Sequence, residues 1–274
     1  MGSGVIKDID KQNIDRLITQ WDGFNPETVY SVMDAPTPLV SIAMLSYRRR
    51  NRLIEVLKRL PTHNTPLNMC LRVQESPEDP EVIELLEKFY DYDVMFSDVN
   101  LGTAVPRQER SRTALKFNTP FIMFTDDDIK MPPYSIELLT SILIDNPEYG
   151  AVNMFTAPNS NVWREIGEGQ INDQKPIGVF DCDRIASLGA ATLVVRREVF
   201  ETCDVDTDMK IGLVDVDFGL QVFKSGWKMG MLNINGYHAV NQKGGDAEYH
   251  KARDNREWIN ASVKHFKTKW SEYS

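Results

Sequence analysis

Short, nearly continuous apolar runs alternate with amphipathic segments along the first half of the chain. Residues 39–45, Leu-Val-Ser-Ile-Ala-Met-Leu, are typical of a strand that is buried on both faces. Leucine and isoleucine then fall on one side of residues 51–60, which predicts a helix. The same alternation predicts further strands at 67–73, 94–96 and 120–124 and further helices at 80–90 and 108–116. We therefore expect an α/β fold with a mostly parallel, doubly wound central sheet flanked by helices.

The second half of the chain is less regular. Apolar runs predict strands at 151–155, 190–195 and 229–234, and the loop-rich stretch 156–187 separates the first two. A predicted helix at 216–225 is followed by Gly226, a typical C-terminal cap. The charged tail, 247–270, predicts an amphipathic C-terminal helix. At the other end of the chain, four apolar residues fall on one helical face: Ile14, Leu17, Ile18 and Trp21.

The composition narrows the class of protein. The 274 residues are 42% hydrophobic and 26% charged, which suits one large α/β domain or two lobes that share a sheet. A net charge of −9 gives no general attraction to nucleic acid or to an anionic membrane. The sequence shows neither a signal-peptide pattern nor an apolar run near the ~20 residues of a membrane helix. Three cysteines without metal-type pairing favour free thiols, so we expect a cytoplasmic protein.

Three adjacent aspartates follow the fourth predicted strand. Because like charges repel, residues 126–128 require a compensating cation or strong hydrogen bonding, and oxygen ligands suit Mg²⁺ or Mn²⁺. Side chains alternate along an extended chain, so Asp126 and Asp128 are predicted as the functional pair, with Asp127 pointing away as a structural hydrogen-bonding group. The alternative interpretation is a solvated acidic turn in which Asp128 caps a helix near Pro132.

Polar residues also follow the first two predicted strands. Ser46 and Tyr47 come after the first strand, and Gln74 and Glu75 come after the second. In a parallel sheet, ligands bind beyond the carboxyl ends of the strands. These four residues and the aspartates are therefore expected to converge on one crevice.

Several segments resemble family-2 glycosyltransferases of the GT-A fold, over about residues 38–270. Residues 40–49 look like that family's opening nucleotide-binding strand, and residues 124–128 resemble its Asp-x-Asp strand. The segment Asn100-Leu-Gly102, with Arg107 downstream, is similar to the family's Asn-Leu-Gly segment and arginine. Residues 189–200 look like its acceptor-side strand.

The second acidic motif of that family resembles residues 214–218. The family usually has Glu-Asp-x-Asp there, so Val214 is a departure, whereas Asp215 matches the family's base. His238 matches the position of a metal ligand. A second departure lies at residues 74–75, where the family often has an aspartate for the uracil ring, and this leaves the nucleotide base open.

The resemblance implies an inverting glycosyltransferase that moves a sugar from a nucleoside-diphosphate sugar, with a UDP-linked donor favoured, to an acceptor hydroxyl. It implies Mn²⁺ or Mg²⁺ held by Asp128 and His238 with Asp126, and Asp215 as the base. Donor contacts are expected from Ser46, Tyr47, Arg48, Gln74, Glu75, Asn100, Gly102, Arg107, Asp126 and Asp127. Acceptor contacts are expected from Gly189, Asp217 and Trp227.

The same resemblance divides the chain into four parts. They are an N-terminal helical extension at 1–35, a nucleotide-sugar-binding subdomain at 36–150, an acceptor-binding and catalytic-base subdomain at 151–240, and a C-terminal loop and helix at 241–274. Prolines 36 and 38 support the first boundary, because they forbid a continued helix.

Other interpretations stay open at this point. Asp215 alternatively caps a helix that begins at Val216, Asp217 alternatively serves as a structural partner, and His238 alternatively has a structural role. A sugar nucleotidyltransferase usually carries a Gly-rich phosphate loop after its first strand, and residues 46–50 contain no glycine. A non-catalytic carbohydrate-binding protein on the same fold is the other alternative. The acceptor is open among a glycan, a metabolite, a protein and a modified nucleic acid.

Overall fold

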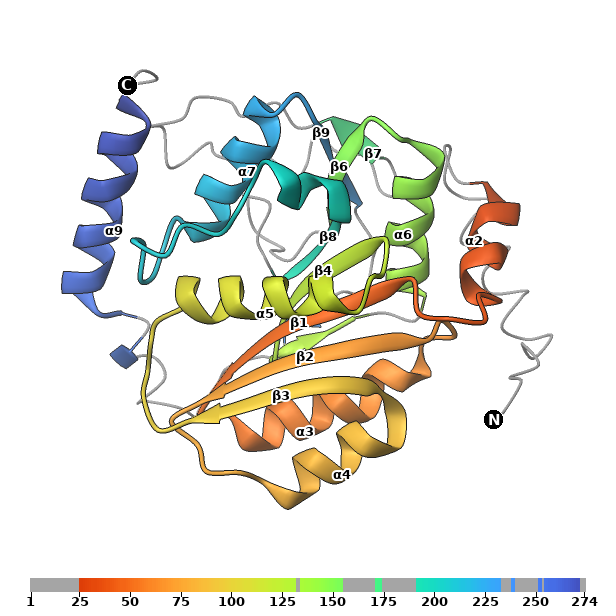
Figure 1. Cartoon of the computed structure of the whole chain (residues 1–274), viewed down its shortest axis with the longest axis horizontal. Helices are drawn as coiled ribbons and strands as arrows, with labels where there is room; N and C mark the ends of the chain where they lie inside the picture. The colour runs from red at the N-terminus through yellow and green to blue at the C-terminus, as the bar shows by residue number, and fades with distance from the viewer. Residues whose placement is uncertain are drawn as a thin grey trace.

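The computed structural model describes residues 25–131, 134–154, 171–173, 191–232, 238–239, 251–252 and 254–271. Within them, an eight-stranded sheet has the order β3-β2-β1-β4-β8-β6-β9-β7 (Figure 1). Strand β10 pairs separately with β5. The strands are β1 (Val40–Tyr47), β2 (Leu67–Gln74), β3 (Asp91–Ser97), β4 (Phe121–Asp126), β5 (Ile129–Lys130), β6 (Tyr149–Met154), β7 (Ile171–Asp173), β8 (Thr192–Arg196), β9 (Lys228–Leu232) and β10 (His238–Ala239).

The helices lie between these strands and at both ends of the described chain. They are α2 (Pro26–Met33), α3 (Arg50–Arg59), α4 (Pro80–Phe89), α5 (Ala104–Lys116), α6 (Ser135–Asp145), α7 (Val214–Lys224) and α9 (Arg256–Lys269), with short 3-10 turns η1 (Leu60–Thr62) and η3 (Arg197–Glu201). The mixed α/β architecture predicted from the apolar runs is therefore confirmed.

The sheet is parallel in its first half and mixed in its second. Strands β3, β2, β1 and β4 pair in parallel. Strand β8 lies between β4 and β6 and runs antiparallel to both. Strand β9 is parallel to β6, and β7 is antiparallel to β9. Because the first four strands share one direction, their carboxyl ends meet at one edge of the sheet.

Helices cover both faces of the sheet (Figure 1). On one face, apolar residues of β1 such as Ile42 and Met44 pack with α2, α3, α4 and α6. On the other face, Ala43 and its neighbours pack with α5, α7 and α9. The residues between the sheet and α5 are small, namely Ala43, Cys70, Ala104 and Ala114, and all are buried. Small side chains let α5 lie close to the sheet, so its first turn is held next to the strand ends.

Some element boundaries differ from the predicted ones. Helix α5 begins at Ala104 and not at residue 108, and α7 begins at Val214 and not at residue 216. Helix α6 was not predicted, because its apolar residues surround the helix and nine of its residues are buried, which removes the one-sided pattern. The N-terminal helical face at 14–21 lies outside the described residues.

Two further expectations concern cysteines and membranes. Cys70 and Cys203 are free, as expected, and both are buried. Burial raises the pKa of the Cys70 thiol to about 12. Cys182 lies outside the described residues. In the part of the chain that the structure describes, the helices are too short or too polar to cross a membrane.

Candidate functional site

The carboxyl ends of β1, β2 and β4 meet at the candidate site. The register places Leu45 of β1 beside Asp126 of β4, and Tyr47 of β1 beside Gln74 of β2. The polar residues that follow these strands are therefore neighbours in space. Helix α5 and helix α7 add residues to the same region from the face that they cover.

Asp127 lies at the centre of a buried polar group. Its side chain has no exposed surface, and its two oxygens accept hydrogen bonds from Ser46 Oγ, at 2.5 Å, and from the Arg49 guanidinium. Burial raises the pKa of Asp127 to about 7, while Arg49 and Ser46 act in the opposite direction. These contacts fit the structural role predicted for Asp127. Ser46 is 1% exposed, so neither its side chain nor that of Asp127 faces solvent. This burial contradicts the contacts with a nucleotide-sugar donor that were expected from Asp127 and Ser46.

Asp126 and Asp128 are not arranged as a simple alternating strand. Strand β4 ends at Asp126, and residues 127–128 form a turn, so Arg49 reaches both Asp127 and Asp128. The distance from Arg49 Nη1 to Asp128 Oδ2 is 2.6 Å. Asp126 turns toward α5 instead, where its Oδ1 lies 3.3 Å from Arg107 Nη2, and its side chain is 30% exposed. The turn, and not the strand, sets the directions of these carboxylates.

Tyr47, Arg48 and Glu75 form a second cluster just beyond the carboxyl ends of β1 and β2. The Tyr47 hydroxyl donates a hydrogen bond to Glu75 Oε2 at 3.0 Å, and Arg48 Nε lies 2.6 Å from the same oxygen. Burial and the nearby Glu75 carboxylate raise the pKa of Tyr47, so its hydroxyl keeps its proton and acts as a donor. The side chains of Arg48 and Glu75 are partly exposed. All three are accessible at the edge where a ligand would enter.

Gln74 has a different role from the one expected. Its side chain is 1% exposed, its Nε2 donates to the Gly102 carbonyl at 2.9 Å, and its Oε1 accepts from the Leu101 nitrogen at 2.7 Å. Both ends of the amide are used to hold the 100–102 loop, which contradicts a direct donor contact. Asn100 supports the same loop, because its Oδ1 accepts from the Gly102 nitrogen at 2.8 Å.

Asp215 lies in the first turn of α7. The helix begins at Val214 with Leu213 in the capping position, so the cap interpretation of Asp215 is wrong. Among the described residues, its half-buried carboxylate has no hydrogen-bond or ion-pair partner. It lines a narrow, mostly apolar pocket of about 10 Å³ together with Arg107, Phe124, Leu193, Val205, Val214 and Phe218. The pocket therefore joins Asp215 to the arginine that contacts Asp126.

Asp217 is a structural partner of the C-terminal helix. Its side chain has no exposed surface and accepts hydrogen bonds from Gln221 at 2.7 Å, Lys269 at 2.9 Å and Trp270 Nε1 at 2.8 Å. This burial contradicts the expected acceptor contact. The network attaches α9 to α7 two residues beyond Asp215.

Two more expected acceptor residues fall elsewhere. Trp227 packs against Gly150 and precedes Lys228, which pairs with Tyr149 at the start of β6. That is the end of the sheet away from the aspartates, since the other end of β6 meets Thr192, which pairs with Thr125. The acceptor role of Trp227 is therefore contradicted. Gly189 lies outside the described residues.

The backbone of His238 lies next to the aspartate turn. Strand β10 pairs antiparallel with β5, and His238 is opposite Lys130, two residues after Asp128. The residues present fit a divalent cation, because carboxylate oxygens of Asp126 and Asp128 are hard ligands and His238 comes from an adjacent strand. Asp128 and Asp126 would hold Mn²⁺ or Mg²⁺ there. His238 stays a predicted third ligand, because only its backbone is among the described parts of the structure.

Another group of possible ligands lies near α9. In the described part of the chain, only Asp206, Asp208 and His265 bring three such atoms within 4.8 Å of one another. Lys269 Nζ already lies 2.7 Å from Asp206 Oδ2, and His265 Nε2 lies 3.1 Å from it. This arrangement is an ion-pair network that ties α9 to the loop before α7.

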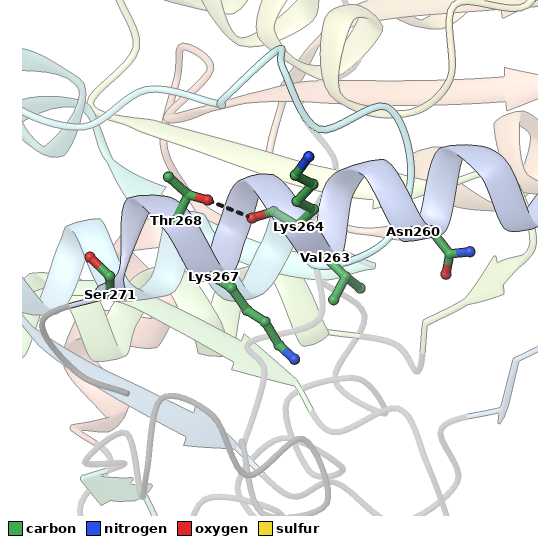
Figure 2. A pocket seen from close by; sticks show the side chains of 6 residues that line it. All are labelled: Asn260, Val263, Lys264, Lys267, Thr268 and Ser271. Atoms are coloured by element: carbon green, nitrogen blue, oxygen red, sulfur yellow. Dashed lines mark hydrogen bonds between the residues drawn. The ribbon is translucent and has the colours of Figure 1, made fainter.

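A wider hollow lies along α9, and Figure 2 shows the side chains that line it. Its described lining comes from α9 and from the residue after Trp270: Asn260, Val263, Lys264, Lys267, Thr268 and Ser271. Thr268 Oγ1 donates to the Lys264 carbonyl at 3.0 Å, a contact within the helix. None of the predicted site residues is among these described lining residues, so the candidate site remains the cluster at the strand ends.

Two residues of the site were not anticipated from the sequence. Arg49 was not among the predicted site residues, yet it is 6% exposed and contacts two of the aspartates. Lys210 carries a backbone oxygen that contacts the start of α5. The signal for Arg49 was its place directly after the first strand end, whereas nothing in the sequence marked Lys210.

Comparisons with known proteins find likeness in structure alone. No protein-family model matches the sequence, and the curated proteins give no match to it. The mannosyltransferase PcManGT of Pyrobaculum calidifontis, solved in complex with GDP-Man and Mn²⁺, has a TM-score of 0.56 at 16% identity, with 89% of this chain and 67% of that chain covered.

Two bacterial proteins are similar at the same level. Glucosyl-3-phosphoglycerate synthase from Mycobacterium tuberculosis, in complex with Mn²⁺, UDP-Glc and phosphoglyceric acid, has a TM-score of 0.56 at 11% identity, covering 89% of this chain and 84% of that chain. TarS from S. aureus has a TM-score of 0.54 at 11% identity over 78% of this chain, and the match spans 38% of TarS. The chain thus has the GT-A type of fold that these structures share.

Proposed function

We propose that this protein is an inverting glycosyltransferase of the family-2 type, which moves a sugar from a nucleoside-diphosphate sugar to an acceptor hydroxyl. One observation carries the proposal. Asp215, a half-buried carboxylate without a partner among the described residues, lines one pocket with Arg107, and Arg107 contacts Asp126. A candidate base, a candidate phosphate-binding arginine and a candidate metal ligand are thus in one place.

The donor side of the reaction needs charge stabilisation for the departing diphosphate. A divalent cation, when bound, supplies Lewis-acid stabilisation of that diphosphate. Arg107 adds a positive charge and hydrogen-bond donors that suit phosphate oxygens, and its position on the first turn of α5 directs it toward Asp126. Tyr47, Arg48 and Glu75, beyond the ends of β1 and β2, supply both donors and an acceptor for the nucleoside. We assign these residues to donor binding.

The acceptor side needs a base for the hydroxyl proton. Asp215 is the candidate, because its carboxylate reaches the pocket from the first turn of α7. A single base opposite the leaving group produces direct displacement, which inverts the anomeric carbon. The acceptor hydroxyl is therefore expected to approach from the α7 side.

A panel of nucleotide sugars that includes UDP-glucose and GDP-mannose tests the proposal. Release of nucleoside diphosphate is measured with Mn²⁺ and with EDTA, and NMR reads the anomeric configuration of the transferred sugar. We expect metal-dependent release with at least one donor and inversion in the product. If no donor is turned over and no nucleotide binds in the presence of metal, the enzymatic function is wrong. A retained configuration would contradict only the inverting mechanism.

A further inference from the structure

Arg49 lies under the aspartate turn because of the backbone just before it. Strand β1 ends at Tyr47, and Arg48 adopts a left-handed conformation with φ of 55°. Such a conformation is uncommon for a residue with a side chain and persists where surrounding contacts determine it. Arg49 is the residue that directly precedes α3. The turn at Arg48 therefore separates an exposed arginine from a buried one.

The Arg49 guanidinium bridges two neighbouring carboxylates. Its Nη2 contacts Asp127 Oδ1, and its Nη1 contacts Asp128 Oδ2 at 2.6 Å. The side chain of Arg49 is 5% exposed, that of Asp127 is fully buried, and that of Asp128 is 10% exposed. Ser46 Oγ donates a hydrogen bond to the other carboxylate oxygen of Asp127, and this contact holds Asp127 in place next to Arg49. The contact with the buried Asp127 thus holds the planar, fork-shaped guanidinium of Arg49 in place, and its Nη1 donates to Asp128.

We propose that Arg49 is a positioning residue of the cation site, which orients Asp128 for the metal through Asp127 and Ser46. This inference rests on the proposed function, because it assigns Asp128 to the cation. A carboxylate that binds a metal is commonly fixed by a second hydrogen-bonding partner, and loss of such a partner typically costs roughly 10–100-fold in metal affinity. The planar guanidinium of an arginine binds two carboxylates at once in a fixed geometry, whereas the ammonium group of a lysine is a compact point charge on a flexible stem.

The test measures Mn²⁺ binding to the full chain in the absence of nucleotide, by electron paramagnetic resonance of free Mn²⁺. All variants are compared well below their unfolding temperatures, with the fold checked by circular dichroism. We expect Arg49→Gln to raise the Kd for Mn²⁺ by about 10–100-fold. Arg49→Lys keeps a charge without the fork, so we expect an intermediate Kd. If Arg49→Gln does not fold, the Kd of Arg49→Lys for Mn²⁺ tests the proposal in its place.

Arg50→Gln is the matched control. Arg50 is adjacent in sequence, its side chain is 50% exposed, and it pairs with Asp79 and Glu81 away from the aspartate turn. Its removal is expected to leave the Kd for Mn²⁺ unchanged. An effect equal to that of Arg49→Gln would indicate a general change of surface charge and would overturn the proposal.

Asp128→Asn separates this inference from the proposed function. If Asp128→Asn weakens Mn²⁺ binding and Arg49→Gln does not, Asp128 binds the cation but Arg49 does not position it. Tighter Mn²⁺ binding by Arg49→Gln would show that Arg49 competes with the cation for Asp128, which also overturns the proposal. If Asp128→Asn has no effect on Mn²⁺ binding, the cation site of the proposed function is itself wrong.

Discussion

The backbone nitrogen of Thr103 donates a hydrogen bond of 2.7 Å to the carbonyl oxygen of Lys210. Thr103 Oγ1 lies 3.3 Å from the same oxygen. Thr103 directly precedes α5, which carries Arg107, and Lys210 lies in the loop before α7, which carries Asp215. The contact therefore holds the proposed donor side and the proposed base side of the site at a fixed separation.

Replacement of Gly102 by alanine is expected to break this contact. Gly102 has φ of +81°, and a Cβ there would lie 2.3 Å from the Lys210 oxygen. Strain and overlap together predict a loss of about 2–4 kcal/mol in the free energy of unfolding, with reduced turnover. Gly212→Ala is the control, because Gly212 has φ of +76° and an added Cβ meets no atom within 4 Å. Chemical denaturation should show a smaller loss for it, near 1 kcal/mol.

Asp215→Asn is expected to separate chemistry from donor binding. The amide cannot accept the proton from the acceptor hydroxyl, so kcat should fall by roughly 10²–10⁴-fold. The donor Kd, measured by calorimetry in the presence of Mn²⁺, should change little. Asp208→Asn, an exposed position in the preceding loop, is the control for the substitution itself. Wild-type turnover in Asp215→Asn would remove Asp215 as the base.

Asp217→Asn is expected to loosen the C-terminal helix. The buried carboxylate binds Lys269 and Trp270, and breaking a buried ion pair costs about 3 kcal/mol or more. Urea denaturation should show this loss, and hydrogen exchange in α9 should become faster. An unchanged stability with a raised KM for the acceptor would instead restore the acceptor role that the burial of Asp217 contradicts.

The stability of the protein is expected to depend on Glu137 in mildly acidic solution. Glu137 is fully buried in α6, where its carboxylate accepts hydrogen bonds from the backbone nitrogens of Asn64 and Thr65 and lies 3.1 Å from His63 Nδ1. Burial would raise its pKa, but His63 and the donated hydrogen bonds outweigh burial and leave the pKa below its usual value of 4.5. A lowered pKa stabilises the fold above pH 4.5, and this contribution is lost as the pH falls through the pKa of the folded protein.

Glu137→Gln therefore has a pH-dependent cost. We expect about 3 kcal/mol of destabilisation at pH 7, which becomes smaller below pH 4.5. Glu87→Gln, at an exposed position of α4, is the control. Unfolding curves from pH 3 to 7 measure both variants, and a constant difference for Glu137→Gln across this range would contradict the proposed linkage.

The first half of the fold could be predicted well because three of its strands, β1, β2 and β4, are buried on both faces. Continuous apolar runs such as residues 39–45, when they alternate with amphipathic helices, are typical of buried strands in a parallel sheet. The parallel order then predicts that the carboxyl ends of these strands lie at one edge of the sheet. The second half was less predictable because β8 is antiparallel and lies between strands that precede it in sequence. Pairing of this kind depends on contacts between distant residues, which a local pattern does not contain.

The site residues divide in a similar way. The convergence of Tyr47, Glu75 and Asp126 follows from strand order, so sequence reasoning places them together. The internal role of a buried polar side chain does not follow from strand order. Ser46, Gln74 and Asp217 were expected to face ligands, and they instead hold other parts of the chain. Burial of a polar residue depends on its partners, and those lie far away in sequence.

The central position of β8 also bears on how the sheet is assembled during synthesis. Strand β4 pairs with β1 on one side, and its other side is completed only by Thr192–Arg196. Until these residues leave the ribosome, the nascent chain carries an open strand edge next to the aspartate turn. Such edges readily pair with other chains. We therefore expect nascent chains that stop before residue 192 to need chaperone protection and chains that extend past residue 196 to lose this requirement.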